Sequence, residues 1–504
     1  HMSRGFVYLI GAGPGDQGLM TVKGLEALKK SDVVIYDHLA GVSLLTQAPL
    51  EAELIYAGKQ AGKHYMKQEE TTALMIKKAA QGKVVARLKG GDPFIFGRGG
   101  EEALALKDAG IDYEVIPGVS SSYAAAAYAG IPVTHRAMAS SFHVITGHED
   151  ASKEASSLDY EVLAKEEGTL VFMMGLKNLP QITQKLIRHG KNGKTPAAVI
   201  ERGTLAGQKC VTGTLETIAE DVSAAGIKTP AVTVIGQVAS LHKKLDWLGQ
   251  GPLAGRRVLV TASRELSGQL CEDIRSLGGE PADVSLIYTV PIHGNVLKQW
   301  MAKPEAYTWI VLTSRNGVDI FFEHMKNAGI DIRRLSHLKF AVIGSGTKKA
   351  LEARGIFADC LPEKYSSRHL GEVLVPMLNK NDSVLLLRAK EASDVLPQML
   401  EQAGVNYRCL PIYKTVTDGR RAEELNRMAQ SSDYVTFCSA SAVHAFCENL
   451  EPQTHVGGKI VCIGPVTAAA AARAGFKEIL TAEVYTTKGL AKCMAKDAGG
   501  ESLS

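Results

Sequence analysis

Short apolar segments alternate with amphipathic helical segments along the whole of this 504-residue chain. The strand-like segment 5–13 (GFVYLIGAG) is followed by the helical segment 22–31 (VKGLEALKKS), and another strand-like segment follows at 32–37 (DVVIYD). Strands that alternate with helices in this way are typical of α/β proteins. Because the length exceeds what one hydrophobic core normally serves, we expect roughly two to four domains.

A cluster of glycines and a proline marks the predicted boundary near residues 240–256, between the strand-like segments 231–238 (AVTVIGQV) and 257–262 (RVLVTA). Glycine and proline between two periodic segments indicate a linker. We therefore expect one domain at 4–245 and a second at 254–500.

Composition excludes several classes of protein. A net charge of +4 is small for a nucleic-acid-binding chain, so we expect no nucleic-acid partner. No run of about 18 apolar residues occurs and no basic-then-apolar leader precedes the first strand, which predicts a cytoplasmic protein without a membrane partner. All eight cysteines lie beyond residue 200 without a C-x-x-C pair. We therefore expect neither a metal site nor a disulfide framework.

The second half contains an internal repeat in three segments. Residues 257–279 resemble 383–405, residues 309–322 resemble 434–447, and residues 341–355 resemble 461–475. Each copy reads as strand, polar turn and helix three times over, which predicts two similar flavodoxin-like lobes with a cleft between them.

Hydroxyl and basic residues follow the predicted strands of both copies. In such sheets ligands bind beyond the carboxyl ends of the strands, so these residues are candidates for binding a carboxylate substrate. Capping of helix N-termini by serine and threonine explains the same positions equally well. The candidates are Arg264, Ser314, Ser345, Ser439 and Thr467.

Glycine-rich turns follow the strands of the first half. The turn 11–16 (GAGPGD) has an aspartate in place of the third glycine of a dinucleotide-binding motif, which disfavours a nicotinamide cofactor. The string 88–102 (LKGGDPFIFGRGGEE) is more specific, because its glycines let the main chain approach a ligand closely. The strings 116–121 (IPGVSS) and 130–136 (GIPVTHR) are further turns of this kind.

These strings resemble those of uroporphyrinogen-III C-methyltransferase, and so do 174–176 (MGL), 201–204 (ERGT) and 229–236 (TPAVTVIG). The resemblance extends over residues 4–248. The resemblance implies two α/β subdomains with S-adenosylmethionine between them, in a homodimer formed through this domain. It also places the family's cofactor contacts on ten residues: Pro14, Gly90, Gly91, Asp92, Ile95, Ser120, Ser121, Met174, Gly203 and Ala231.

The same resemblance implies that Asp37 is the proton acceptor and Lys59 the proton donor. Holding an electron-rich pyrrole carbon in line with the activated methyl is the main task, and a base then accepts a proton. Asp37 could equally be a turn residue. Basic side chains suited to the carboxylates of the substrate, with solvated surface as the alternative for each, are Arg98, His135 and Arg136, beside Lys59.

Residues 254–495 resemble uroporphyrinogen-III synthase, which has two lobes joined by a pair of strands. The resemblance implies a first lobe at about 254–288 plus 416–500 and a second at about 289–415, with segments 287–292 and 410–416 as the hinge strands. Tyr413 matches a family tyrosine near the substrate, where it assists loss of the hydroxyl group. Packing of Tyr413 against the hinge is the alternative.

Together these resemblances predict a bifunctional enzyme that cyclises hydroxymethylbilane to uroporphyrinogen III and methylates it twice to precorrin-2. One alternative is a methyltransferase of later corrin synthesis fused to a domain that only binds tetrapyrrole. A second alternative makes the C-terminal half a sensor or scaffold without catalysis. The sequence leaves open whether the product serves sirohaem or cobalamin synthesis.

Overall fold

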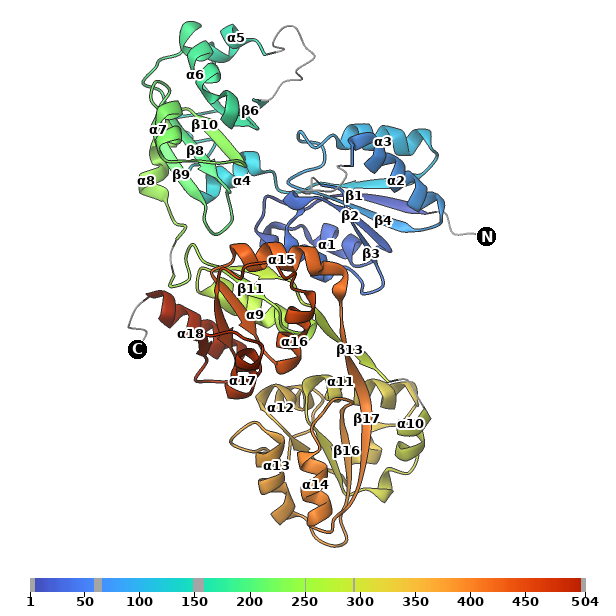
Figure 1. Ribbon diagram of the computed structural model, residues 1–504. Coiled ribbons are helices and arrows are strands. Elements are labelled where there is room, and N and C mark those ends of the chain that lie inside the picture. Colours follow the sequence, from blue (N-terminus) through green and yellow to red (C-terminus); the bar gives the residue numbers. More distant parts are fainter. Residues whose placement is uncertain (1–4, 59–65, 148–157, 250, 293–294, 500–504) are drawn as a thin grey trace. The chain divides into compact units, whose positions relative to one another are not determined.

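The computed structural model describes residues 5–58, 66–147, 158–249, 251–292 and 295–499 (Figure 1). The predicted α/β class is confirmed, because the described residues form four five-stranded sheets with helices between the strands. The chain divides into two compact units. The first comprises residues 1–262, 266–285 and 420–504, and the second comprises 263–265 and 286–419.

The first sheet is parallel, in the order β3-β2-β4-β1-β5. Its strands are nearly continuous apolar runs because both faces are buried. Ile10, Val34 and Leu88 pack on one face, whereas Leu9, Ile35 and Val85 pack on the other. The strands are β1 (Phe6–Gly11), β2 (Val33–Tyr36), β3 (Glu53–Tyr56), β4 (Val84–Lys89) and β5 (Asp112–Ile116), and the helices are α1 (Val22–Leu28), α2 (Gln68–Ala80) and α3 (Gly99–Asp108).

The second sheet is mixed, in the order β6-β7-β10-β8-β9. Its strand β10 is antiparallel to both neighbours, β7 and β8. The strands are β6 (Phe142–Thr146), β7 (Thr169–Met173), β8 (Pro196–Glu201), β9 (Lys209–Thr214) and β10 (Ala231–Ile235). The helices are α4 (Ser121–Tyr128), α5 (Tyr160–Lys165), α6 (Leu179–Arg188), α7 (Ile218–Ala224) and α8 (His242–Leu245).

The third sheet belongs to the first unit and is parallel, in the order β12-β11-β18-β19-β20. Its strands are β11 (Arg257–Val260), β12 (Glu280–Asp283), β18 (Tyr434–Phe437), β19 (Lys459–Cys462) and β20 (Ile479–Thr481). The accompanying helices are α9 (Arg264–Ser276), α15 (Ala422–Ser431), α16 (Ala440–Asn449), α17 (Pro465–Arg473) and α18 (Thr487–Gly499).

The fourth sheet belongs to the second unit, in the order β13-β17-β16-β14-β15. Its edge strand β13 pairs antiparallel with β17, so the two segments that the sequence pairs as hinge strands do lie side by side. The strands are β13 (Ile287–Pro291), β14 (Trp309–Leu312), β15 (Lys339–Val342), β16 (Ser383–Ala389) and β17 (Asn406–Thr417). The helices are α10 (Asn295–Met301), α11 (Arg315–Asn327), α12 (Ser345–Glu352), α13 (Ser367–Leu374) and α14 (Val395–Gln402).

The repeat is distributed over both of these sheets. In the third sheet β11 of the first copy pairs with β18 of the second, whereas in the fourth sheet β16 of the second copy pairs with β14 of the first. Each sheet therefore combines the first segment of one copy with the later segments of the other. This exchange explains how one duplicated sequence builds two separate sheets.

Candidate functional site

Three turns of the first sheet meet where β1, β4 and β5 end. Gly13 and Gly91 form an isolated antiparallel bridge, and Asp92 Oδ2 accepts a hydrogen bond of 2.9 Å from the Gly118 N–H. A methyl group at Gly118 would lie 2.2 Å from the Gly91 carbonyl oxygen. Only glycine fits at position 118, because a side chain there would collide with the main chain of Gly91. The turns therefore meet through their main chains.

Turns of the second sheet meet the first set through a small network of hydrogen bonds. The Asp16 N–H donates to Thr204 Oγ1 at 3.0 Å, and Tyr128 Oη donates to Asp16 Oδ2 at 2.8 Å. Gly203 packs so closely that an added methyl would lie 2.4 Å from Ala125 Cβ. Asp16, which stands in place of the third glycine of a dinucleotide-binding motif, thus links the two sets of turns.

The two sets of turns line one cavity of about 1770 Å³. Five residues other than glycine have a positive φ among the described residues, and all five line this cavity: Phe96, Arg98, Met174, Arg202 and Thr204. A positive φ strains the backbone of residues that carry a side chain, and such residues gather at binding sites. The strain therefore marks the cavity as the functional site of the N-terminal half.

All ten cofactor positions implied by the resemblance line this cavity. Asp37, the first residue after β2, and Arg98 line it as well. His135 and Arg136 are exposed and lie outside its lining. Lys59 lies outside the described residues.

A buried charge cluster that the sequence does not predict lies beside the cavity. Glu102 of α3 is completely buried and contacts the side chains of Arg87 and Lys89, each at 3.1 Å and each 5% exposed. Gln68 Nε2 of α2 donates a 2.9 Å hydrogen bond to Glu102 Oε1. The sequence signal for this cluster was two basic residues two positions apart in the otherwise apolar string VVARLK.

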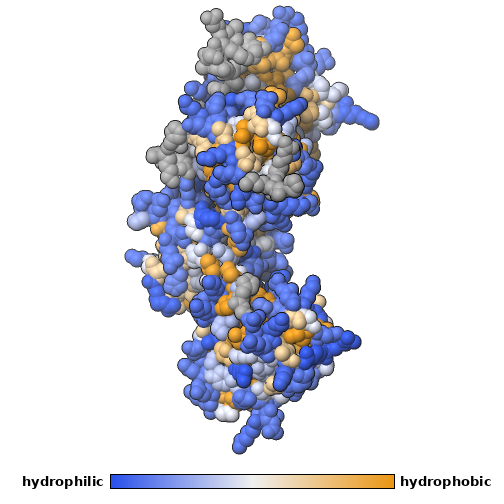
Figure 2. Space-filling model, turned by 90° about the vertical axis from the view of Figure 1, so that its right-hand side faces the viewer, coloured by the Kyte–Doolittle hydropathy of each residue, from blue (hydrophilic) through white to orange (hydrophobic). Residues whose placement is uncertain are grey.

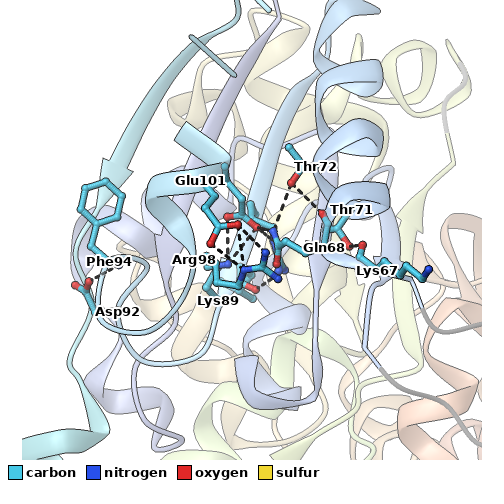
Figure 3. Close-up of polar contacts among 12 residues, drawn as sticks. Lys67, Gln68, Thr71, Thr72, Lys89, Asp92, Phe94, Arg98 and Glu101 are labelled. Carbon is cyan, nitrogen blue, oxygen red and sulfur yellow. Dashed lines mark hydrogen bonds and ion pairs between the residues drawn. The ribbon is translucent and has the colours of Figure 1, made fainter. Parts of the chain in front are cut away.

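Arg98 is the N-cap residue of α3 and has a left-handed conformation, and its guanidinium pairs with Glu101, with Nη2 at 2.6 Å from Oε2. Both side chains are about half exposed. Figure 3 shows this pair close to Lys89 and Gln68. Arg98 therefore offers a charged group at the edge of the cavity, whereas Lys89 is enclosed.

In the second unit, Tyr413 of β17 is buried and its hydroxyl lies 2.5 Å from Ser314 Oγ. Burial raises the pKa of the Tyr413 phenol. Ser314 Oγ also accepts the Gly317 N–H as the N-cap of α11. Ser345 is the first residue of α12 and is half-buried, and Arg264 is the first residue of α9 and is also half-buried.

In the first unit, Ser439 caps α16 and accepts the Ala442 N–H at 3.1 Å. Thr467 is buried in the first turn of α17. Ser439 and Ser314 are therefore equivalent caps in the two copies of the repeat. The capping interpretation holds for both serines, but only Ser314 also bonds a buried tyrosine.

The described residues contain no group of three or more histidine, cysteine, aspartate or glutamate side chains arranged to hold a metal ion. Within the same residues, no helix is long and apolar enough to cross a membrane. The face of the molecule in Figure 2 is mostly hydrophilic, and its apolar side chains gather in a few separate patches.

Comparison with family models assigns a class to each half. Residues 7–219 match the model described as Tetrapyrrole (Corrin/Porphyrin) Methylases, and residues 268–492 match Uroporphyrinogen-III synthase HemD. The turns of the first sheet that line the cavity lie in the first match, and most of the repeated pair of sheets lies in the second. Fold and site thus define a fusion of a tetrapyrrole methylase with a uroporphyrinogen-III synthase.

Three relatives agree with this division. The chain is 38% identical to "Porphyrin biosynthesis protein HemD" of Ruminiclostridium josui over 99% of both chains. It is 42% identical to a "Uroporphyrinogen-III C-methyltransferase" of Bacillus subtilis over 71% of this chain and 74% of the relative. It is 50% identical to the "S-adenosyl-L-methionine-dependent uroporphyrinogen III methyltransferase" of Methanosarcina barkeri over 49% of this chain and 95% of the relative. The chain belongs to the family of fused tetrapyrrole methylases and uroporphyrinogen-III synthases.

Proposed function

We propose that this chain closes hydroxymethylbilane to uroporphyrinogen III and then transfers two methyl groups from S-adenosylmethionine to give precorrin-2. The observation that carries the proposal is the presence of both families in one chain, with a relative that is similar over 99% of both lengths. The two reactions are consecutive, since the product of the synthase is the substrate of the methyltransferase. Fusion places both steps on one polypeptide.

The cavity residues fit S-adenosylmethionine. Gly90, Gly91 and Gly203 bring main chain to the ligand without side chains in the way, and the buried Ser120 belongs to the lining. Ile95 and Met174 supply apolar contacts for the flat base. Pro14, Asp92, Ser121 and Ala231 complete the proposed set of contacts. When bound, the ligand supplies an activated methyl group.

The chain's own residues position the macrocycle and move a proton. We assign Asp37 as the acceptor of the proton that the macrocycle loses after methylation, because it lines the cavity at a strand end. Lys59 remains the proposed donor. Arg98 is a proposed partner of a substrate carboxylate, and the exposed His135 and Arg136 are proposed for carboxylates that extend beyond the cavity.

The synthase reaction requires departure of a hydroxyl group and closure of the ring with its last pyrrole inverted. Tyr413 is the proposed donor of a hydrogen bond to the departing hydroxyl. Its raised pKa keeps the phenol protonated, and Ser314 holds the oxygen in place. Arg264, Ser345, Ser439 and Thr467 are proposed contacts of the substrate carboxylates.

The finer architecture is part of the proposal. The orders β12-β11-β18-β19-β20 and β17-β16-β14-β15 both follow the 2-1-3-4 pattern of flavodoxin-like sheets, which supports two flavodoxin-like lobes. The first two sheets support two subdomains in the methyltransferase half. We assign residues 4–245 to the methyltransferase and 254–500 to the synthase, with lobes at about 254–288 plus 416–500 and 289–415.

We also propose a homodimer formed through the methyltransferase domain, as the family resemblance implies. Eight free cysteines suit a reducing compartment, which supports a cytoplasmic location. The proposed partners are small tetrapyrroles rather than nucleic acid or membrane.

Each half is tested by its own assay. Uroporphyrinogen III supplied anaerobically with methyl-labelled S-adenosylmethionine is expected to gain two labelled methyl groups. Hydroxymethylbilane supplied alone is expected to give the type III isomer. Absence of label in the first assay contradicts the methyltransferase, and exclusive formation of the type I isomer in the second contradicts the synthase.

A further inference from the structure

Two exposed tyrosines occupy equivalent positions in the two copies of the repeat. Tyr365 lies as far behind segment 341–355 as Tyr485 lies behind segment 461–475. Tyr365 is 42% exposed in the second compact unit, and Tyr485 is 50% exposed in the first. Within the described part of the chain, neither tyrosine hydroxyl makes a hydrogen bond. Both rings are therefore available to a ligand.

Both tyrosines lie at the centre of the same kind of turn. In each turn the N–H of the following residue donates to the carbonyl of the preceding one, at 2.9 Å from Ser366 to Lys364 and at 2.8 Å from Thr486 to Val484. The hydroxyls of Ser366 and Thr486 then cap the N-termini of α13 and α18. Because main-chain groups and these hydroxyls hold the turns, neither turn requires an aromatic ring at its centre.

A glycine after a strand fixes the position of each ring. A methyl group added at Gly344 would lie 3.6 Å from Tyr365 Cδ2, and one added at Gly464 would lie 3.3 Å from Tyr485 Cδ1. Each ring therefore lies against the main chain of the glycine that precedes α12 or α17. A ring that is already held in place loses little conformational freedom when a ligand binds.

These glycines lie at the sheet edges where substrate contacts are proposed. β14 and β15 are parallel neighbours, and Ser314 and Gly344 each lie two residues beyond them. β18 and β19 are parallel neighbours as well, and Ser439 and Gly464 each lie two residues beyond them. Ligands of such sheets bind beyond the carboxyl ends of the strands. Each tyrosine ring is therefore at the same edge as a serine that is proposed for the synthase site.

We propose that Tyr365 and Tyr485 are substrate-binding residues of the synthase, each of which packs its ring against a pyrrole of hydroxymethylbilane. The inference rests on the proposed function, in which this half of the chain cyclises that substrate. Pyrroles are flat and electron-rich, and tyrosine rings pack on aromatic partners in offset or edge-to-face arrangements. Contacts with rings that persist throughout the reaction stabilise substrate and transition state alike, so they act on KM rather than on kcat.

The test removes each ring separately in the full-length chain. Tyr365→Ala and Tyr485→Ala remove the ring, whereas Tyr365→Phe and Tyr485→Phe keep it. Phe357→Ala is the matched control, because Phe357 is 73% exposed in the second unit but follows the C-terminal end of α12, whereas Gly344 precedes the first residue of that helix. KM and kcat are measured for formation of the type III isomer from hydroxymethylbilane, and thermal unfolding reports the integrity of the fold.

We expect each alanine variant to raise KM for hydroxymethylbilane by about 3- to 10-fold, since loss of an aromatic pair has an effect of that size. The value of kcat is expected to stay within about twofold, and the phenylalanine variants and Phe357→Ala are expected to keep the wild-type KM. An unchanged KM in either alanine variant overturns the inference for that tyrosine, and so does a phenylalanine variant that binds as weakly as the alanine variant.

If an alanine variant does not fold, the leucine variant at the same position, which keeps an apolar side chain but lacks the ring, decides by the same criterion. Absence of type III product from the wild-type chain would instead contradict the proposed function.

Discussion

At the scale of single residues, the methyltransferase site separates enclosed charges from exposed ones. Lys89 and Glu102 are shielded from solvent, so their charges act on neighbours at low effective dielectric, whereas the Arg98–Glu101 pair is about half exposed and is screened. Asp37 lines the same cavity at the end of β2.

Substitution of Asp37 by asparagine tests the proposed proton acceptor. The amide keeps an oxygen for the Leu39 N–H but cannot take up the proton, so kcat for methylation is expected to fall by about 10²- to 10⁴-fold. Affinity for S-adenosylhomocysteine, measured by calorimetry, is expected to change less than about threefold. A variant with near wild-type kcat would show that another group accepts the proton.

Substitution of Tyr413 by phenylalanine tests the proposed synthase residue. Because burial raises the pKa of the phenol above its usual value of 10, Tyr413 stays protonated across the neutral and mildly alkaline range. The rate of type III formation should therefore show no decline from this group as pH rises toward 10. In Tyr413→Phe the type III fraction is expected to fall at least about tenfold relative to type I at every pH in that range. Unchanged isomer ratios by chromatography would contradict the assignment.

The sequence predicts the site only where local chemistry demands particular residues. Gly91 and Gly118 lie in glycine-rich strings because main chain touches main chain there, and such strings are visible without a structure. The Lys89–Glu102 contact joins a strand to the following helix in three dimensions, so the basic residues of the string VVARLK signal a buried charge but do not identify its partner. The antiparallel strand β10 was equally hidden, since an apolar run carries no information on direction.

At the scale of elements, the turns after β1, β4 and β5 depend on contacts that exclude a side chain. Gly118→Ala is expected to weaken S-adenosylhomocysteine binding by at least about tenfold, because its methyl would meet the Gly91 carbonyl at 2.2 Å. Gly100→Ala in α3 is the matched control, since an added methyl there meets nothing within 4 Å. The control is expected to bind normally and to gain up to about 1 kcal/mol of helix stability. Equal affinities by calorimetry would contradict close packing of these turns.

The repeated helices α11 and α16 share one capping arrangement. Ser314→Ala and Ser439→Ala are each expected to cost about 1 kcal/mol locally, because each removes the acceptor of an N-terminal N–H. Faster hydrogen exchange in the first turn of the affected helix is the measurement, with the corresponding Ser→Thr variants as controls that retain the cap. If protection from hydrogen exchange in both alanine variants equals that of the wild-type chain, the caps do not stabilise these helices.

At the scale of the whole molecule, two consecutive reactions share one chain, and their proposed catalytic residues lie in different compact units. Asp37 belongs to the first unit, where residues from both halves of the sequence line its cavity, whereas Tyr413 belongs to the second unit. The exchange of segments between copies of the repeat agrees with the resemblance to uroporphyrinogen-III synthase, which implies a first lobe drawn from both ends of the C-terminal half. The repeat alone does not indicate it. The unit boundaries themselves depend on contacts that no single string encodes.

The most direct test of the account is one anaerobic incubation of the full-length chain with hydroxymethylbilane and methyl-labelled S-adenosylmethionine. Mass spectrometry and isomer analysis of the tetrapyrroles then report on both halves together. The account predicts two labelled methyl groups on a type III skeleton. Methylated type I product would contradict the synthase half, and unmethylated type III product would contradict the methyltransferase half.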